Sequence, residues 1–233
     1  YPNDNKEVLN DISFVIEPGK TLAIIGRTGS GKSTVSDLAA RMYDPLKGTI
    51  LLDGIPLDNY ELSSLRSNIG YVPQEVFLFS DTIANNISFG IENGAEMDRI
   101  EKAAVNAHIH HNIIDFKDGY SSVMGERGLT LSGGQKQRIS IARALIREPK
   151  LMLLDDCLSA VDTETEAAIL SNLKEIMSNN TTIISSHRIS SIQHADEIIV
   201  LDQGKIIERG THQALLNKKG DYFSLYKKQL TDN

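Results

Sequence analysis

Residues 21–33, TLAIIGRTGSGKS, place a short apolar run directly before a glycine-rich turn. The apolar residues 22–25 have the composition of a buried parallel strand. A helix is predicted to follow, from Ser33 to about Tyr43, where an Asp-Pro pair ends the helical pattern. A strand that leads through a tight turn into a helix is the repeating unit of a parallel sheet, so this stretch predicts an α/β fold.

Residues 26–33, the phosphate loop, fit the pattern G-x-x-x-x-G-K-[ST] at every fixed position. Glycines let successive backbone N–H groups point inward, and the helix start adds partial positive charge. Lys32 is expected to reach the terminal phosphates of ATP, and the Ser33 hydroxyl to bind Mg²⁺. The alternative is a glycine turn that only connects strand and helix. The nucleotide-binding residues predicted here are Gly26, Arg27, Thr28, Gly29, Ser30, Gly31, Lys32, Ser33 and Thr34.

Two carboxylates follow the apolar run at residues 151–154. Such a run delivers acidic residues from a buried strand to the ligand edge of an open α/β sheet. We expect Asp155 to hold Mg²⁺ through water, and Asp156 to orient or deprotonate the attacking water. Taken alone, two acids after a strand are more often a solvated turn. The phosphate loop upstream favours the catalytic interpretation.

The remaining pattern predicts a single domain with an insertion. Residues 1–75 and 150–233 carry the strand-like segments, including 11–17 and a hairpin that turns at Asp53-Gly54. Residues 76–149 show apolar residues at helical spacing, notably in 98–110 and 134–147. The expected fold is α/β, with a mainly parallel sheet, an N-terminal antiparallel β subdomain and an inserted α-helical subdomain. Further core segments are predicted as strands at 182–186 and 197–201 and a helix at 163–177.

Composition excludes several classes of protein. The chain has 233 residues, a formal charge of -7 and no dense run of Lys or Arg, so nucleic-acid binding is disfavoured. Its single cysteine, Cys157, excludes an internal disulfide framework. No apolar run reaches the length of a membrane-spanning helix, and no signal pattern is found. Because the chain begins at Tyr1, in the middle of a motif, we expect an excised domain.

The stretch LSGGQKQR at residues 131–138 resembles the signature of the ABC (ATP-binding cassette) ATPases. This resemblance covers essentially the whole chain. It implies that Ser132, Gly133, Gly134 and Gln135 bind the γ-phosphate of a nucleotide held by an opposite subunit. A helix start is suited to that role because its free N–H groups attract anions. An ordinary Ser N-cap before an amphipathic helix is the structural alternative, and both can hold together.

Other positions resemble further parts of the family in order. Tyr1 resembles the aromatic residue that stacks on adenine, and Gln74 resembles the glutamine near Mg²⁺ and water. Residues 159–162, SAVD, resemble the segment that meets the partner subunit, here called the D-loop. His187 follows a predicted strand and resembles the switch histidine; a lone histidine would more often be packed or solvated. The resemblance thus implies a catalytic set of Lys32, Gln74, Asp156 and His187, with Ser33, Gln74 and Asp155 at Mg²⁺.

Three weaker segments are similar to exporter-type members: residues 125–128, 77–83 and 210–212. The resemblance implies two such domains that close head to tail around ATP, attached to transmembrane domains on the same or another chain. It places the chain at the cytoplasmic face of a membrane, as a soluble domain. Alternatives are an importer cassette, a soluble ABC ATPase linked to nucleic acid, or a regulatory ATP-binding module.

One position departs from the family pattern. The family's catalytic residue directly after the acidic strand is Glu, whereas this chain has Asp156. A displacement of about 1 Å in a water-activating carboxylate can cost about 10²-fold in rate. The site on this chain's own phosphate loop is therefore predicted to be slow. That feature resembles the degenerate half of heterodimeric bacterial exporters, while a homodimer that tolerates Asp is the alternative.

Overall fold

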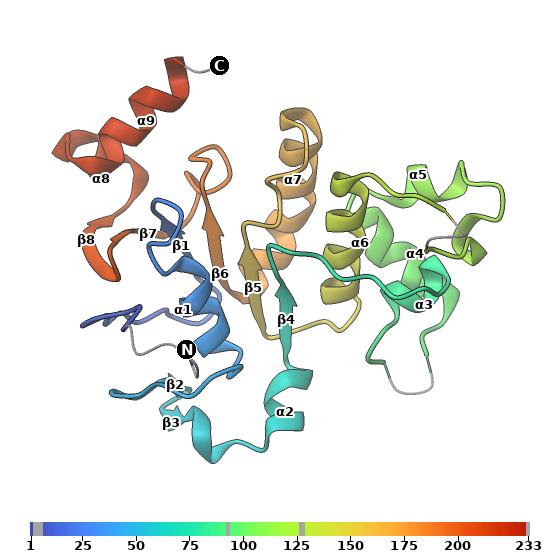
Figure 1. Cartoon of the computed structure of the whole chain (residues 1–233), viewed down its shortest axis with the longest axis horizontal. Helices are drawn as coiled ribbons and strands as arrows, with labels where there is room; N and C mark the ends of the chain where they lie inside the picture. The colour runs from blue at the N-terminus through green and yellow to red at the C-terminus, as the bar shows by residue number, and fades with distance from the viewer. Residues whose placement is uncertain (2–6, 92–93, 126–128, 232–233) are drawn as a thin grey trace.

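A sheet of six strands, in the order β4-β5-β6-β1-β7-β8, forms the centre of the computed structural model (Figure 1). The structure describes residues 1, 7–91, 94–125 and 129–231 of the chain. The first five strands in this order are parallel, and β8 pairs antiparallel with β7. They are β1 (Thr21–Ile25), β4 (Ile69–Val72), β5 (Leu151–Asp155), β6 (Thr181–Ser186), β7 (Glu197–Asp202) and β8 (Lys205–Gly210). Parallel strands bring their carboxyl ends to one edge, so the residues after β1, β5 and β6 meet there.

Helices surround this sheet and continue beyond it. Figure 1 shows α3 to α6 gathered beyond the β4 edge, and α8 and α9 beyond the opposite edge, near β8. The α-helices are α1 (Lys32–Ala39), α2 (Leu62–Ser67), α3 (Ile83–Ile87), α4 (Met97–Asn106), α5 (His110–Ile114), α6 (Gly133–Leu145), α7 (Thr163–Asn179), α8 (His212–Lys218) and α9 (Asp221–Thr231), and the short 3₁₀ turns are η1 (Leu57–Asn59) and η2 (Gly119–Ser121). The helical stretch between β4 and β5 falls within the segment predicted to be helical.

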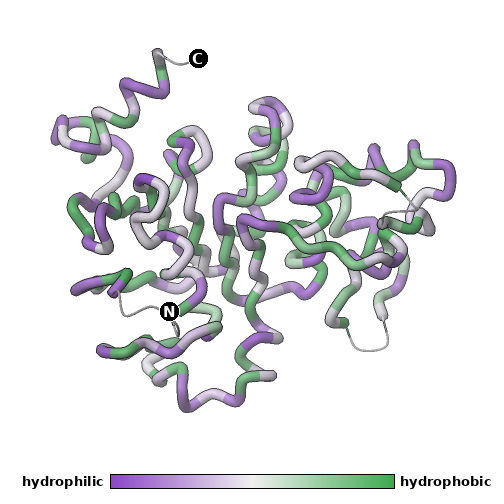
Figure 2. The backbone as a smooth tube through the Cα atoms, viewed as in Figure 1, coloured by the Kyte–Doolittle hydropathy of each residue, from purple (hydrophilic) through white to green (hydrophobic). Residues whose placement is uncertain are grey.

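Hydrophobic side chains pack on both faces of the sheet because neighbouring strand residues point to opposite sides. In β1, Leu22 and Ile24 join one buried cluster together with Val35 of α1. Ala23 and Ile25 join the other, which extends through α6 and α7 into α3, α4 and α5. Stretches of the central strands are accordingly coloured as hydrophobic in Figure 2. The second cluster thus connects the sheet and the inserted helices in one continuous core.

The predicted hairpin is confirmed in a short form. Strands β2 (Leu51–Leu52) and β3 (Ile55–Pro56) pair antiparallel and make a separate sheet. The two turn residues between them, Asp53 and Gly54, have φ of 50° and 78°. Positive φ at both central positions is the geometry whose twist matches a two-residue hairpin, which explains the Asp-Gly pair.

The strand predicted at residues 11–17 is wrong. No strand is assigned between residues 7 and 20, although Ile12, Phe14 and Ile16 pack against the core with the expected alternation. Asp11 lies in the left-handed region, with φ of 56°, which interrupts an extended backbone at the start of the segment. The alternation of apolar residues therefore predicted burial correctly, but it did not predict strand pairing.

Two predicted helices are shorter than expected for a similar backbone reason. The first ends at Ala39 because Arg41 has φ of 49°, and the helix predicted over 98–110 is divided into α4 and α5 at His108, which has φ of 55°. The other predicted core elements are confirmed within one or two residues.

Candidate nucleotide-binding site

The phosphate loop connects β1 to α1 and depends on its glycines. A side chain at Gly26 would place its Cβ 2.1 Å from the carbonyl oxygen of Leu201, and Gly31, with φ of 106°, has the Leu9 side chain 2.6 Å from that position. Neither position has room for a side chain. The loop is thus held closely against the Leu201 backbone and the Leu9 side chain.

Lys32 folds back over this loop. Its Nζ donates hydrogen bonds to the carbonyl oxygens of Gly26, at 2.9 Å, and Arg27, at 3.1 Å. Burial lowers the pKa of Lys32, whereas the nearby carboxylates of Asp156 and Asp155 oppose that shift. A cation that is desolvated and held only by carbonyl oxygens is well placed to bind an anion more strongly than it could in water.

Ser30 adds an unsatisfied polar group to the same loop. Its hydroxyl is buried and has no hydrogen-bond partner among the described residues, although its backbone carbonyl accepts from the Gly204 N–H at 3.1 Å. Buried hydroxyls without a partner are rare in folded proteins and call for an explanation. A phosphate oxygen in the loop would supply the missing partner.

Asp155 and Asp156 lie at the carboxyl end of β5, as predicted. Asp155 is 2% exposed, pairs in register with Ser185 of β6 and accepts a hydrogen bond from the Ser185 hydroxyl. Asp156 then turns out of the strand with φ of 43°, while its N–H still donates to the Ser185 carbonyl at 2.9 Å. The two carboxylates therefore point in different directions from adjacent positions.

Two residues that the sequence suggested separately, Gln74 and His187, meet at the Asp156 carboxylate. Gln74 Nε2 lies 3.5 Å from Oδ2, and His187 Nε2 lies 3.9 Å from the same oxygen. The His187 N–H also donates to Oδ1, at 3.4 Å. Burial raises the pKa of Asp156, an effect that His187 and Lys32 oppose. A raised pKa suits a carboxylate that must take a proton from water.

The signature residues start α6. Ser132 is its N-cap, and a capping box joins the Ser132 hydroxyl to the Gln135 N–H, at 3.2 Å, and the Gln135 side chain to the Ser132 N–H, at 2.9 Å. The structural alternative, an N-cap, is therefore present. In the described part of the chain no hydrogen bond or ion pair joins residues 132–135 to residues 26–34, and α1 and α6 are well separated in Figure 1.

The D-loop packs directly on the signature helix. Gln137 of α6 donates to the Ser159 hydroxyl at 3.3 Å and accepts from the Ala160 N–H at 3.1 Å. A side chain at Gly134 would come within 2.9 Å of the Ala160 carbonyl oxygen. The second signature glycine is therefore required for close packing as well as for any contact with phosphate.

Tyr1 lies beside the first helix after the phosphate loop. Its hydroxyl is hydrogen bonded to Thr34 Oγ1 at 2.9 Å, and its ring meets the ring of Tyr43 edge-on with centroids 5.0 Å apart. Tyr1 is 46% exposed. The ring therefore offers free area next to the loop, as an adenine-stacking residue requires; Pro2 lies outside the described residues.

The three exporter-like segments are unequally described. Residues 126–128 lie outside the described residues, and Gly125 before them has φ of 138°. In residues 77–83, Phe77 and Phe79 are exposed, with ring centroids 5.0 Å apart. In residues 210–212, Thr211 is the N-cap of α8.

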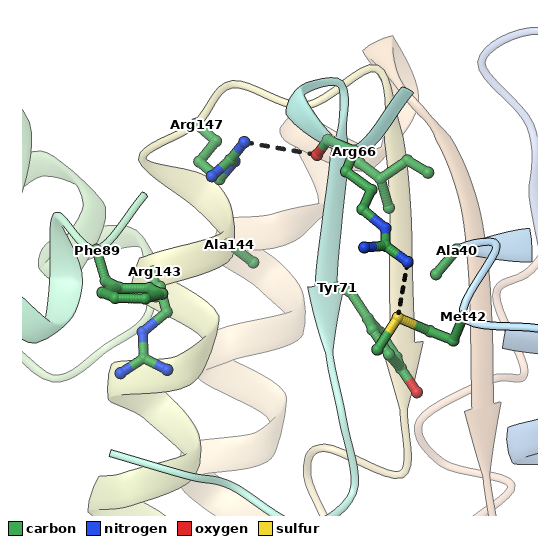
Figure 3. Close-up of a pocket in the computed structure, with 9 residues that line it drawn as sticks. Ala40, Met42, Arg66, Tyr71, Phe89, Arg143, Ala144 and Arg147 are labelled. Atoms are coloured by element: carbon green, nitrogen blue, oxygen red, sulfur yellow. Dashed lines mark hydrogen bonds between the residues drawn. The ribbon is translucent and has the colours of Figure 1, made fainter. Parts of the chain in front are cut away.

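A separate pocket lies between β4 and α6 (Figure 3). Figure 3 shows Tyr71 among the residues that line it, together with Arg66, Arg143 and Arg147. Arg147 donates to the Arg66 carbonyl at 3.5 Å. The Arg143 guanidinium lies 5.7 Å from the Phe89 ring centroid. None of the lining residues belongs to the predicted nucleotide set, so this pocket is distinct from the nucleotide-binding site.

Sequence reasoning assigned no role to several residues that hold the site together. Ser185 positions Asp155, Gln137 joins the signature to the D-loop, and Arg188 donates to the carbonyls of Val161 and Ser159, at 3.0 and 3.2 Å. All three residues lie inside or beside the motifs around the signature and His187. Their position in the sequence could therefore have indicated a role at the site.

A glycine loop with a terminal lysine after a central parallel strand, and an acid at the end of a neighbouring strand, is the arrangement of phosphate-loop nucleotide-hydrolysing proteins. Residues 9–159 match the family model described as ABC transporter. The chain belongs to the ABC transporter family.

Its similarity to individual proteins extends over nearly all of the chain. It is 50% identical to the uncharacterized ABC transporter ATP-binding protein YknU of Bacillus subtilis, over 100% of this chain and 40% of that protein. It is 47% identical to an ATP-dependent lipid A-core flippase of Pseudomonas aeruginosa, over 97% of this chain and 38% of the flippase. A bacterial Atm1-family ABC exporter, solved with ATP bound, superposes with a TM-score of 0.91 and 43% identity, over 97% of this chain and 40% of that one.

Two of these relatives are a flippase and an exporter by name, and this chain spans about two fifths of the length of each of the three proteins. It corresponds to their ATP-binding domain. In the described ranges, no helix has the length and apolar character needed to cross a membrane.

Proposed function

We propose that this chain is the ATP-binding and ATP-hydrolysing domain that powers export across a membrane, attached to transmembrane domains at the cytoplasmic face. The observation that carries the proposal is the meeting of Gln74 and His187 at the Asp156 carboxylate, in a fold whose phosphate loop holds Lys32 against its own carbonyls. The relatives of similar sequence, an ATP-dependent flippase and an exporter, support the coupling to transport.

For nucleotide binding, we assign the adenine to Tyr1 and the phosphates to residues 26–34. Lys32 would leave its carbonyl partners and contact the terminal phosphates, and the buried Ser30 hydroxyl would gain its missing partner. The Ser30 hydroxyl would gain a charge-assisted hydrogen bond, which is about twice as strong as a neutral one. The Lys32 ammonium would exchange neutral carbonyl acceptors for a group of opposite charge.

For Mg²⁺, we assign Ser33, Asp155 and Gln74. Magnesium keeps several waters and needs only one or two carboxylates besides the substrate phosphates. The residues fit this preference: Asp155 is a buried carboxylate with one oxygen occupied by Ser185. The described residues contain no cluster of three or more His, Cys, Asp or Glu side chains arranged for a metal. When bound, the ion would neutralise phosphate charge during transfer.

For hydrolysis, Asp156 would orient the attacking water and accept its proton, with Gln74 and His187 fixing the carboxylate from two sides. The short Asp side chain would make this site slow. The second half of the reaction chamber would come from a partner subunit, whose signature residues Ser132, Gly133, Gly134 and Gln135 would close over the γ-phosphate. We propose that residues 76–149 act as the helical subdomain that presents this signature.

A second function deserves a test because of Asp156: a regulatory domain that binds ATP and turns it over poorly, paired with a competent partner. The intact capping box at Ser132 agrees with this version, since the chain could still complete a partner's site. Both versions predict a dimer of two nucleotide-binding domains, either as a homodimer or as a heterodimer. Nucleic acid is not a proposed partner.

The test is Mg²⁺-dependent ATP hydrolysis by the purified chain, measured over a range of protein concentrations. The Asp156→Glu variant is included so that a slow carboxylate does not hide activity. The expected result is a rate per chain that rises with concentration and is lost in Lys32→Met, with Lys47→Met, an exposed lysine, as the control. Rates equal to that of Lys32→Met in both the wild type and Asp156→Glu would overturn the proposal.

A further inference from the structure

The backbone on either side of His187 is held by a side chain from the end of the chain. Gln229 of α9 accepts a hydrogen bond from the Ile189 N–H, at 2.9 Å, and donates one from Nε2 to the His187 carbonyl oxygen, at 2.7 Å. One amide group thus binds an acceptor and a donor two residues apart. Such a pair fixes both the position and the direction of the backbone segment.

The same segment is bound to the catalytic carboxylate from its other side. The His187 N–H donates to Asp156 Oδ1 at 3.4 Å, and its ring lies 3.9 Å from Oδ2. His187 therefore has its N–H directed to Asp156 and its C=O directed to Gln229. Because Ile189 is fully packed in the core, a shift at Gln229 cannot be absorbed by free movement beyond that residue.

Helix α9, which carries Gln229, is fastened at its beginning. The Glu208 carboxylate of β8 accepts from the N–H groups of Asp221, at 3.2 Å, and Tyr222, at 3.0 Å. Tyr222 is completely buried, and its hydroxyl is hydrogen bonded to His212 at 2.7 Å. Gln229 lies eight residues after Asp221, roughly 12 Å away at the rise of an α-helix. The helix is thus a short rigid arm between β8 and the switch histidine.

We propose that Gln229 is a positioning residue for His187, so that the place of the C-terminal helix α9 sets the rate of the hydrolysis step. The inference rests on the proposed function, because it assigns Gln229 to the same site. Gln229 binds the backbone of His187 and Ile189, and it would act through the backbone that orients His187. Its removal should therefore affect turnover and leave nucleotide affinity unchanged.

The variant that tests this is Gln229→Met, which keeps the length of the side chain and removes its hydrogen bonds to His187 and Ile189. Lys228→Met is the matched control, since Lys228 is the exposed neighbour on the same helix. The ATPase kcat of Gln229→Met, counted per ATP-binding site, should fall by about 3- to 10-fold, as for a group that loses its exact placement. The KM for ATP should stay within about twofold. A chain that ends at Lys228 should show the same fall in kcat.

A second measurement decides the case without relying on activity. The ring resonances of His187, assigned with His187→Gln, should shift in NMR spectra of Gln229→Met and remain in place in Lys228→Met. Unchanged His187 resonances together with unchanged kcat in Gln229→Met would overturn the inference. Absence of ATP hydrolysis in the wild type would instead count against the proposed function, and the NMR comparison would still show whether Gln229 positions His187.

Discussion

Two helices of this chain start at glycine-rich sequences that are expected to bind phosphate, yet their first turns are built differently. The N-cap of α1 is Gly31, which provides no side-chain hydrogen bond, and the preceding Ser30 hydroxyl is buried without a partner among the described residues. The N-cap of α6 is Ser132, whose capping box with Gln135 satisfies two N–H groups from within the chain. The first start has no side-chain cap, and the second already has two of its N–H groups bound by side chains of its own helix.

This difference between the two helix starts indicates that one serves to bind a ligand and the other helps to stabilise the fold. Where a helix start has no side-chain cap, its N–H groups remain available, and an anion gains the full attraction of the helix end. Where a capping box is present, the N–H groups that it binds already stabilise the fold. We infer that the phosphate loop binds nucleotide within one chain, whereas the signature contributes only after a second subunit brings a phosphate to it.

The largest expected effect is on the ATPase rate, and it shows whether the phosphate-loop site or the signature limits turnover. If the carboxylate near the phosphate loop is limiting, Asp156→Glu should raise the ATPase rate by about 10²-fold, because it restores the reach of the water-activating group. The measurement is kcat at saturating Mg-ATP, with Asp156→Asn as the inactive reference. No gain in rate would mean that assembly with the signature, and not Asp156, limits the reaction.

A smaller effect is expected at the signature. Ser132→Ala removes the N-cap and should lower the free energy of unfolding by about 1 kcal/mol, while Ser132→Asn, which keeps a capping acceptor, should lower it less. Urea titration gives these values. The affinity of the isolated chain for ATP should be the same in all three proteins. A clear loss of ATP affinity in Ser132→Ala at low protein concentration would remove the distinction between the two helix starts.

The smallest effect is expected from the Lys32→Met substitution, which should raise the stability of the ligand-free chain, whereas Ser132→Ala should lower it. Burial lowers the pKa of Lys32 in the folded chain below its unfolded value of about 10.5. At a pH between these two values, Lys32 is more often protonated in the unfolded chain than in the folded one. Stability from this group is therefore lost as pH falls through the folded pKa. At neutral pH, Lys32→Met should melt slightly above the ligand-free wild type, and the gap should narrow at alkaline pH. A lower melting temperature for Lys32→Met would show that its bonds to the loop carbonyls outweigh its burial.

Much of this architecture could be predicted because its signals are local in sequence. Residues 21–33 predicted a strand, loop and helix, and the apolar run before Asp155 predicted its place at a strand end. Both predictions are confirmed in position. The strand predicted at 11–17 failed because alternation reports burial, whereas pairing also depends on a backbone partner, and Asp11 turns the chain first.

Contacts between distant residues could not be predicted in the same way. Gln229 reaches His187 across 42 positions, and Arg188 reaches Glu166 across 22, at 2.6 Å. Neither pair belongs to a periodic pattern, so only the folded chain brings them together. The meeting of Gln74 and His187 at Asp156 was predictable in part. The family resemblance indicated these residues, but only the folded sheet shows that they lie close together.

The central claim is that the phosphate loop of a single chain captures Mg-ATP. The most direct test is the affinity of the purified chain for ATP, measured by calorimetry with and without Mg²⁺, for wild type, Lys32→Met and the control Lys47→Met. Wild type and Lys47→Met should bind ATP in a Mg²⁺-dependent manner, and Lys32→Met should bind it about 10- to 100-fold more weakly, the loss expected for a charge-assisted contact. Equal affinities for all three proteins, or no Mg²⁺-dependent binding at any protein concentration, would contradict this claim.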